Sequence, residues 1–149
     1  MFWARTRLLI VTLWVGSLWT VGYLVAPTLF STLPDRVLAG SIAGSLFRIE
    51  AWLSVACTVI LLISVRWGGS NPNFTPTKPW IGLVLGMLAC TLVGYFALQP
   101  FMAALREAAG PGGVMSSDAR MQFGILHGIS SGIYLMQSLL GVALVLKSK

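Results

Sequence analysis

The chain has 149 residues, of which 56% are hydrophobic and only 9% charged, with a mean hydropathy of +0.85. A soluble domain carries charge on about a quarter of its residues, so this composition excludes one and predicts an integral membrane protein. The net charge of +6 does not indicate nucleic-acid binding, because the ten Lys and Arg residues are scattered at the ends of apolar segments. We expect a single membrane domain over residues 1–149, surrounded by the lipid bilayer, with no nucleic-acid partner.

The first apolar segment covers about residues 8–30 and follows Arg5 and Arg7. It is too long for the core of a signal peptide, which has about 7 to 15 residues, and it lacks a clear cleavage site. We therefore expect a retained first span. Pro27 is expected to kink or end this span near its outer end.

The second apolar segment is longer than a bilayer requires. It begins at Pro34 and Asp35, where a proline and a carboxylate favour the first turn of a helix, and it continues to Arg66. That length corresponds to about 50 Å of helix against about 30 Å of hydrocarbon. We expect residues 46–65 to span the bilayer and residues 34–45 to lie at its surface as a short interfacial helix.

A third span is expected over residues 80–98. The stretch before it, residues 67–79, is rich in Gly, Pro and Asn and is typical of a loop. Pro100 is expected to end the span, because proline interrupts helical hydrogen bonding. A second interfacial helix is expected over residues 101–109, before a glycine-rich break.

A fourth span is expected over residues 123–146. Ser116 or Ser117 is suited to cap its helix, with the carboxylate of Asp118 in the first turn. The predicted fold class is therefore all-α: a polytopic, four-transmembrane-helix bundle with short interfacial helices on its outer side.

An even number of spans places both termini on one side of the membrane. The loops and termini on that side carry six Lys and Arg residues and no acid, whereas the opposite side carries four Arg and four acids. The positive-inside rule then predicts cytoplasmic termini, in a bacterial inner membrane. Trp3, Trp67 and Trp80 fall at the terminal boundary and are expected to form part of an aromatic belt.

Small residues recur at every fourth position on the third and fourth spans. This spacing places them on one face of a helix, where another backbone can approach closely. We expect these faces to pack helices together, within the chain, in a homo-oligomer or in a larger membrane complex. The glycines concerned are Gly82, Gly86, Gly94, Gly124, Gly128 and Gly132.

Ionisable residues inside the spans mark a candidate polar site. His127, the only histidine, is expected about four residues inside the outer boundary, at a depth similar to that of Glu50. Such groups are costly in lipid unless they are paired or face water. They therefore either tie helices together or form a ligand or proton site. The candidate set is Arg48, Glu50, Gln99, His127, Ser131 and Tyr134.

Catalysis finds little support in the sequence, which has no nucleophile motif, P-loop or dinucleotide fingerprint. A copper(I) site is an alternative, because His127 could join the sulfur atoms of Met102, Met115 and Met121, although methionine also fills apolar gaps. We expect a non-enzymatic membrane protein without a cofactor, acting through helix packing or as an accessory of a membrane complex. The alternative is a small transporter or a protein that handles metals or toxic compounds.

Two stretches also carry a family resemblance. The first lies within residues 13–52 and includes Pro27, Leu29, Phe30, Ala39, Gly40, Gly44, Leu46 and Phe47; the second is FGILHGIS, residues 123–130. They resemble a bacterial four-span family of domains of unknown function. That family is similar to the eukaryotic transmembrane protein associated with cisplatin resistance, and more loosely to copper-resistance membrane domains. The resemblance implies four helices and leaves transport and metal handling open, without a substrate.

Overall fold

The structure is a computed structural model that describes residues 2–67, 77–110 and 112–148, without the side chains of residues 2–4 and 67. Every regular element in these ranges is helical, and four helical spans are long and apolar enough to cross a membrane. The all-α, four-span class is therefore confirmed. Most of the expected loop at residues 67–79 lies outside the described residues.

The first and third spans are each built from three consecutive helical pieces, whereas the second and fourth are single helices. The first span consists of α1 (Phe2–Trp19), the π-helical turn η1 (Thr20–Val25) and α2 (Ala26–Thr32). The third consists of α4 (Lys78–Thr91), η2 (Leu92–Leu98) and α5 (Gln99–Ala108). The second and fourth are α3 (Arg36–Trp67) and α6 (Ser117–Leu146).

Each of the two π-helical turns ends two residues before a proline. In an α-helix, the ring of Pro27 would clash with the carbonyl of Tyr23, and that of Pro100 with the carbonyl of Phe96. Tyr23 lies in η1 and Phe96 in η2, where the wider helix relieves this contact. Each helix therefore continues through its proline, and the prediction that Pro100 ends the third span is wrong.

The α3 helix is continuous through the segment expected to form a separate interfacial helix. Its N-cap is Asp35, whose Oδ1 accepts bonds from the backbone N–H of Val37 at 2.8 Å and of Leu38 at 3.1 Å. Pro34 thus precedes the helix instead of starting it. The α3 helix has 32 residues, and residues 34–45 form no separate short helix because nothing after Asp35 interrupts the backbone bonding.

The start of the fourth helix agrees with the sequence. The Oγ of Ser116 accepts a bond from the backbone N–H of Ala119 at 3.2 Å, and Asp118 lies in the first turn of α6. A carboxylate at this position interacts favourably with the helix dipole.

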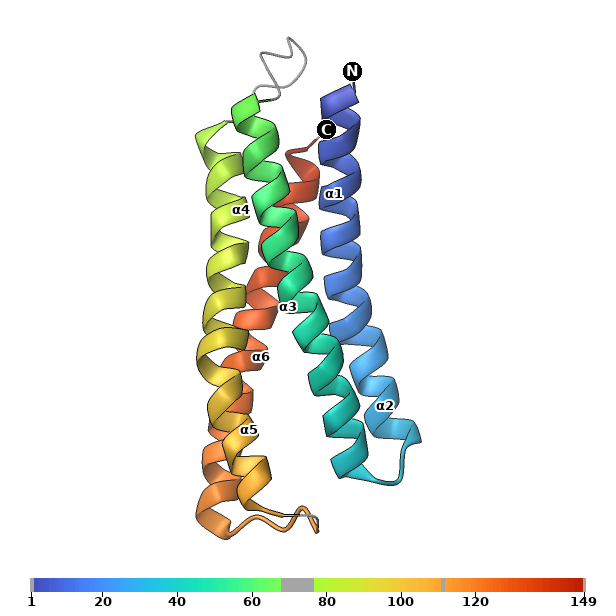
Figure 1. Cartoon of the computed structure of the whole chain (residues 1–149), viewed down its shortest axis with the longest axis vertical. Coiled ribbons are helices and arrows are strands. Elements are labelled where there is room, and N and C mark those ends of the chain that lie inside the picture. The colour runs from blue at the N-terminus through green and yellow to red at the C-terminus, as the bar shows by residue number, and fades with distance from the viewer. Residues whose placement is uncertain (1, 68–76, 111, 149) are drawn as a thin grey trace.

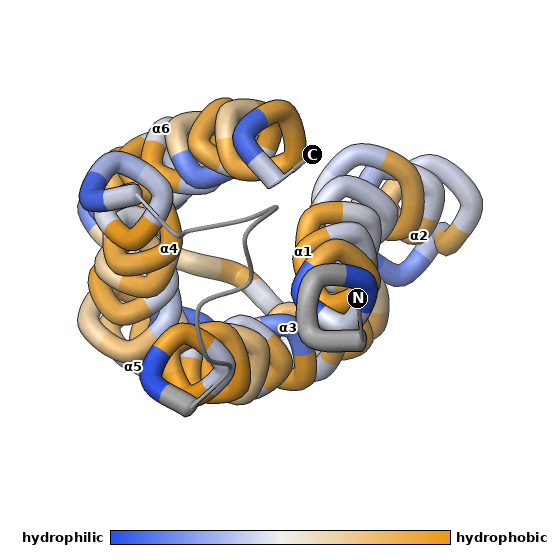
Figure 2. The backbone as a smooth tube through the Cα atoms, turned by 90° about the horizontal axis from the view of Figure 1, so that it is seen from above, coloured by the Kyte–Doolittle hydropathy of each residue, from blue (hydrophilic) through white to orange (hydrophobic). Residues whose placement is uncertain are grey.

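The four spans pack as a ring in which consecutive spans are neighbours. The α1 helix packs against α3 and α6, and α4 packs against α3 and α6. Both ends of the chain lie at the same end of the bundle (Figure 1), which we call the terminal end; the opposite end is the distal end. Viewed from above, most of the backbone has the colours of apolar residues (Figure 2).

The hydrophobic core fills the terminal half of the bundle. Trp14 is buried there, and its Nε1 donates a bond to the Oγ of Ser54 at 2.8 Å. Trp80 is also buried, at 1% exposure, with its Nε1 3.0 Å from the Oγ of Ser148, so its expected place in an aromatic belt is wrong. The structure does not describe the side chains of Trp3 and Trp67, so their place in an aromatic belt stays a prediction. The core consists of Val11, Trp14, Val15, Cys57, Leu61, Trp80, Val84, Met87 and Leu144.

The distal half is divided into two pairs of helices. The α2 helix packs against α3, and α5 packs against α6. The two pairs diverge beyond η1 and η2, as the lower half of Figure 1 shows. Among the described residues, substantial packing between the two pairs is made by α1 with α6 and by α3 with α4 and η2. The bundle is therefore closed at its terminal end and parted at its distal end.

Candidate functional site

The parted distal half contains a cavity of about 890 Å³, which all four spans line. Binding sites for small molecules typically measure about 300–1,000 Å³. Along α3 the lining extends from Arg36 to Ser54, a length of about 27 Å of helix. Most of the wall is apolar and includes Phe30, Phe47 and Ile133. We call this space the distal cavity.

The inner end of the distal cavity is polar. Glu50 is buried, at 5% exposure, and its Oε1 lies 3.2 Å from the hydroxyl of Ser17 on α1. On the opposite side, the Nε2 of Gln137 on α6 donates a bond to the Oγ1 of Thr91 on α4 at 2.9 Å. These bonds link neighbouring spans where the packed core gives way to the cavity.

Tyr134 joins α6 to the first span at this level. Its hydroxyl donates a bond to the carbonyl of Leu18 at 2.6 Å. Its ring lies so close to Gly22 that a Cβ at that position would overlap it. The rings of Phe47 and Tyr23 meet it edge-on, with centroids 5.5 Å and 6.1 Å away. Gly22 is therefore a position of real close approach.

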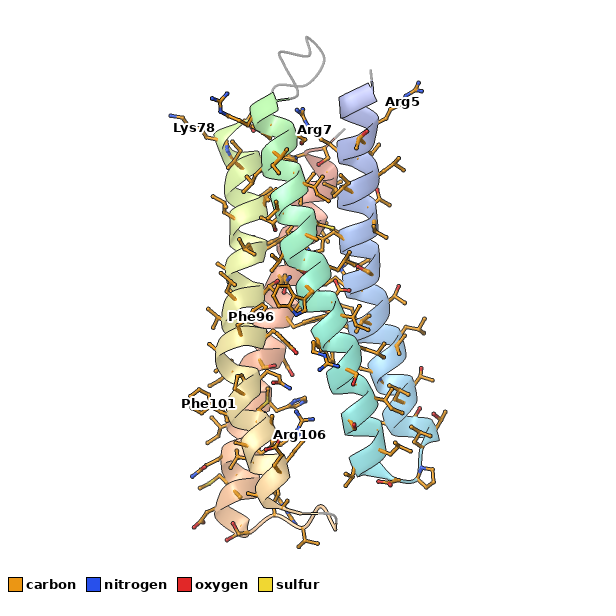
Figure 3. All side chains as sticks on the ribbon, in the orientation of Figure 1. Arg5, Arg7, Lys78, Phe96, Phe101 and Arg106 are labelled. Atoms are coloured by element: carbon orange, nitrogen blue, oxygen red, sulfur yellow. The ribbon has the colours of Figure 1, made fainter. Side chains whose placement is uncertain are left out.

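At the distal end, Arg106 crosses from one helix pair to the other. Its Nη1 donates a bond to the carbonyl of Gly40 on α3 at 3.3 Å, and its guanidinium carbon lies 5.8 Å from the centre of the Phe123 ring. That ring stacks on His127, with centroids 6.1 Å apart and planes 6° from parallel. Figure 3 shows Arg106 pointing from α5 toward α3. A cation over an aromatic face is favourable, so Arg106 and Phe123 support each other.

Five of the six predicted polar residues line the distal cavity: Glu50, Gln99, His127, Ser131 and Tyr134. Arg48 does not line it, and its side chain is exposed. Two residues along an α-helix are about 200° apart around its axis, so Arg48 and Glu50 cannot face the same space. In the part of the chain that the structure describes, the side chains of Glu50 and His127 share the cavity without a hydrogen bond or ion pair between them.

The predicted glycine faces are used only in part. A Cβ on Gly86 would lie 3.3 Å from Leu140, and one on Gly94 would lie 3.6 Å from Ile133, so these two glycines do meet α6. A Cβ on Gly82, Gly124, Gly128 or Gly132 would meet nothing within 4 Å among the described residues. Close packing through the α6 series is therefore wrong for the single chain, because that face points away from the other spans.

Several important residues were missed by the sequence reasoning. Gly141 packs tightly, since a Cβ there would lie 3.2 Å from Val15, and Gly22 accommodates Tyr134. Arg106 is one of the four Arg residues in the charge count of the outer side, and no role in the site was predicted for it. A signal was available, because Gly40 and Gly44 leave α3 without side chains at the level of an arginine on the amphipathic α5; a Cβ on either would lie 3.8 Å from Arg106 Nη1.

The copper(I) site considered from the sequence can be compared with the positions of its four possible ligands. Met102 and Met115 line the same cavity as His127, whereas Met121 is 62% exposed and lies outside the lining. Within the described residues, no three His, Cys, Asp or Glu side chains gather as metal ligands. Cys57 and Cys90 are buried and unbridged. The potential donors that line the cavity are therefore one imidazole, two thioethers, the thiol of Cys90 and the distant carboxylate of Glu50.

Comparison with known proteins identifies a family. No curated protein and no solved structure matches the chain significantly. The family model described as a domain of unknown function, DUF4149, matches residues 9–111. That range covers the first three spans, and thus Glu50, Gln99 and Arg106, and it ends before α6 with His127 and Tyr134. Since the match covers more than half of the sequence, this four-span membrane protein belongs to the DUF4149 family.

Proposed function

We propose that this protein is a non-enzymatic membrane protein that binds a small amphiphilic molecule in the distal cavity, as a carrier or an accessory of a membrane complex. The observation that carries this proposal is the cavity itself, about 890 Å³ between two parted helix pairs. Protein interiors are packed as densely as organic crystals, so an apolar space of this size is filled by lipid or ligand.

The composition of the wall supports an amphiphilic occupant. Apolar side chains such as Phe30 and Phe47 form most of the surface, and a few polar groups converge at the inner and distal ends. Binding sites for small molecules combine these two features, with the polar groups fixing the orientation of the ligand. Glu50 and His127 lie at different levels of this wall, and both contact polar groups of the bound molecule and fix its orientation.

Filling the cavity tests the proposal. The Cβ of Gly44→Phe would have only the flexible end of Arg106 nearby, at 3.8 Å, so the ring can enter the cavity without displacing backbone. Gly16→Phe is the matched control, because Gly16 on α1 has open space around it and lies outside the lining. Lipids that co-purify with each full-length protein are identified by native mass spectrometry, and displacement of a fluorescent fatty-acid probe gives the affinity.

We expect Gly44→Phe to lose the bound molecule and at least about tenfold in probe affinity, equivalent to about 1.4 kcal/mol, while Gly16→Phe behaves as the wild type. Both variants replace a glycine within a helix, so both gain helix propensity. This gain therefore does not explain a difference in probe affinity between them. Equal binding by all three proteins, with equal thermal stability, would contradict a ligand site in the distal cavity.

Assembly is a second candidate function, favoured by Gly124, Gly128 and Gly132, which face open space in the single chain. In this proposal a second copy packs against α6 through these glycines. The test is the mass of Gly128→Leu measured by native mass spectrometry. A dimer lost in the variant, with unchanged monomer stability, supports assembly; a wild-type protein that is monomeric in nanodiscs contradicts it.

We also infer a bacterial inner-membrane location with cytoplasmic termini. The support is the distribution of charge, since Arg5, Arg66, Lys78 and Lys147 lie at the terminal end of the bundle without an acid. Short loops rich in Lys and Arg stay in the cytoplasm. In this orientation the distal cavity lies at the outer leaflet of the membrane.

A further inference from the structure

We propose that the molecule held in the distal cavity is a lipid with a net negative headgroup, which Arg106 and Arg36 bind while the acyl chain runs inward toward Phe47. This inference rests on the proposed function and names the class of ligand. It follows from the placement of charge along the cavity, from the geometry of Arg106 and from the length of the apolar wall.

Charge is distributed unevenly along the cavity wall. Arg36, Arg106 and His127 line its distal half, whereas the only acid in the lining is Glu50. Glu50 is 14 residues after Arg36 on the same helix, about 21 Å farther along its axis. A negative headgroup inside the distal end of the cavity therefore meets two cations and is far from Glu50. The other three acids, Asp35, Glu107 and Asp118, lie at the distal end but outside the lining.

The guanidinium groups of Arg106 and Arg36 have N–H donors that make no hydrogen bond with the described residues. Arg106 uses Nη1 for the carbonyl of Gly40 and Nε for the carbonyl of Met102, at 3.3 Å and 3.4 Å, and both bonds are long. Arg36 makes no hydrogen bond or ion pair with any described residue. Arginine presents five N–H donors in a planar fork that matches phosphate oxygens. The cavity thus has two cations that lack an anionic partner within the described chain.

The two ends of the distal cavity lie at the depths expected for the headgroup and the acyl chain of a lipid. The α5 helix is amphipathic and carries Arg106 and Glu107 near its end, as expected for an element at the level of headgroups. From there the wall continues inward past Phe30 and Phe47 to Tyr134. The lining along α3 covers about 27 Å of helix, more than the about 15 Å of hydrocarbon in one leaflet, so it has room for an extended acyl chain.

The test compares lipids that differ only in the headgroup. The full-length protein is delipidated in detergent and titrated with dioleoyl phosphatidylglycerol, dioleoyl phosphatidylcholine and soluble glycerol 3-phosphate, with native mass spectrometry as the readout. The variants are Arg106→Gln and Arg36→Gln. Arg120→Gln is the matched control, because Arg120 lies at the same end of the bundle but outside the cavity lining.

We expect the wild type and Arg120→Gln to bind phosphatidylglycerol about tenfold more tightly than phosphatidylcholine, since one charge-assisted bond has this magnitude. Each cavity variant should lose most of this preference while keeping its affinity for phosphatidylcholine. Glycerol 3-phosphate should bind far more weakly, because it has no acyl chain. Arg36→Gln keeps the test valid even if Arg106→Gln unfolds, since Arg36 makes no bond that the fold needs.

The two proposals fail in different ways. If both lipids bind equally to the wild type and Gly44→Phe abolishes both, the cavity is a lipid site but the negative headgroup is wrong. If glycerol 3-phosphate binds as tightly as phosphatidylglycerol, the ligand is a soluble anion and the lipid assignment is wrong. If Gly44→Phe changes no affinity, the proposed function itself is wrong.

Discussion

Tyr134 is the side chain on which the boundary between the packed core and the distal cavity depends. It spans the interface between α6 and the first span, with its hydroxyl on the carbonyl of Leu18 and its ring against Gly22. A tyrosine suits such a boundary because its ring is apolar and its hydroxyl is polar. The residue was predicted as part of a polar layer, but its partners lie on α1 and η1 and were not visible in the sequence.

Removing the hydroxyl should destabilise the protein. Tyr134→Phe leaves the ring in place but takes away the 2.6 Å bond to Leu18, so we expect the free energy of unfolding to fall by about 1 kcal/mol. Tyr95→Phe is the control, because the hydroxyl of Tyr95 bonds to none of the described residues. Thermal unfolding in detergent measures both, and equal midpoints would show that the Leu18 bond is not stabilising.

At the scale of the helix, α6 shows what a periodic sequence pattern can and cannot reveal. The interval from Gly124 to Gly132 correctly places these glycines on one face, but periodicity does not say which face meets another helix. Gly141 lies nine residues after Gly132, which is about half a turn around the axis. It is this opposite face that packs against Val15 of α1 and Met87 of α4.

The two faces of α6 should therefore respond differently to the same substitution. The Cβ of Gly141→Leu would lie 3.2 Å from Val15 and 3.5 Å from Met87. The larger side chain must therefore push α1 and α4 away from α6. Overpacking of this kind costs about 1–3 kcal/mol. Gly132→Leu, on the open face, should leave the midpoint of thermal unfolding unchanged or slightly raised. A smaller loss for Gly141→Leu than for Gly132→Leu would contradict the observed packing of α6.

For the molecule as a whole, the sequence was sufficient for features that depend on composition and on local residue type. Four apolar segments, both termini at one end and the Ser116 cap are all of this kind. The parted distal half is not, because it depends on which helices touch. The π-helical turns before Pro27 and Pro100 keep two spans continuous where a simple proline rule ends them. The cavity and the bridging role of Arg106 follow from that tertiary arrangement.

The orientation of the bundle decides which leaflet supplies the ligand, and labelling can determine it. Val114 is 77% exposed at the distal end, and Thr77 is exposed at the terminal end, while Cys57 and Cys90 are buried and give little background. With cytoplasmic termini, a maleimide that cannot cross membranes should label Val114→Cys in spheroplasts and label Thr77→Cys only after the membrane is permeabilised. The reverse pattern would place Arg36 and Arg106 at the cytoplasmic leaflet, where anionic lipids would enter the distal cavity from the inside.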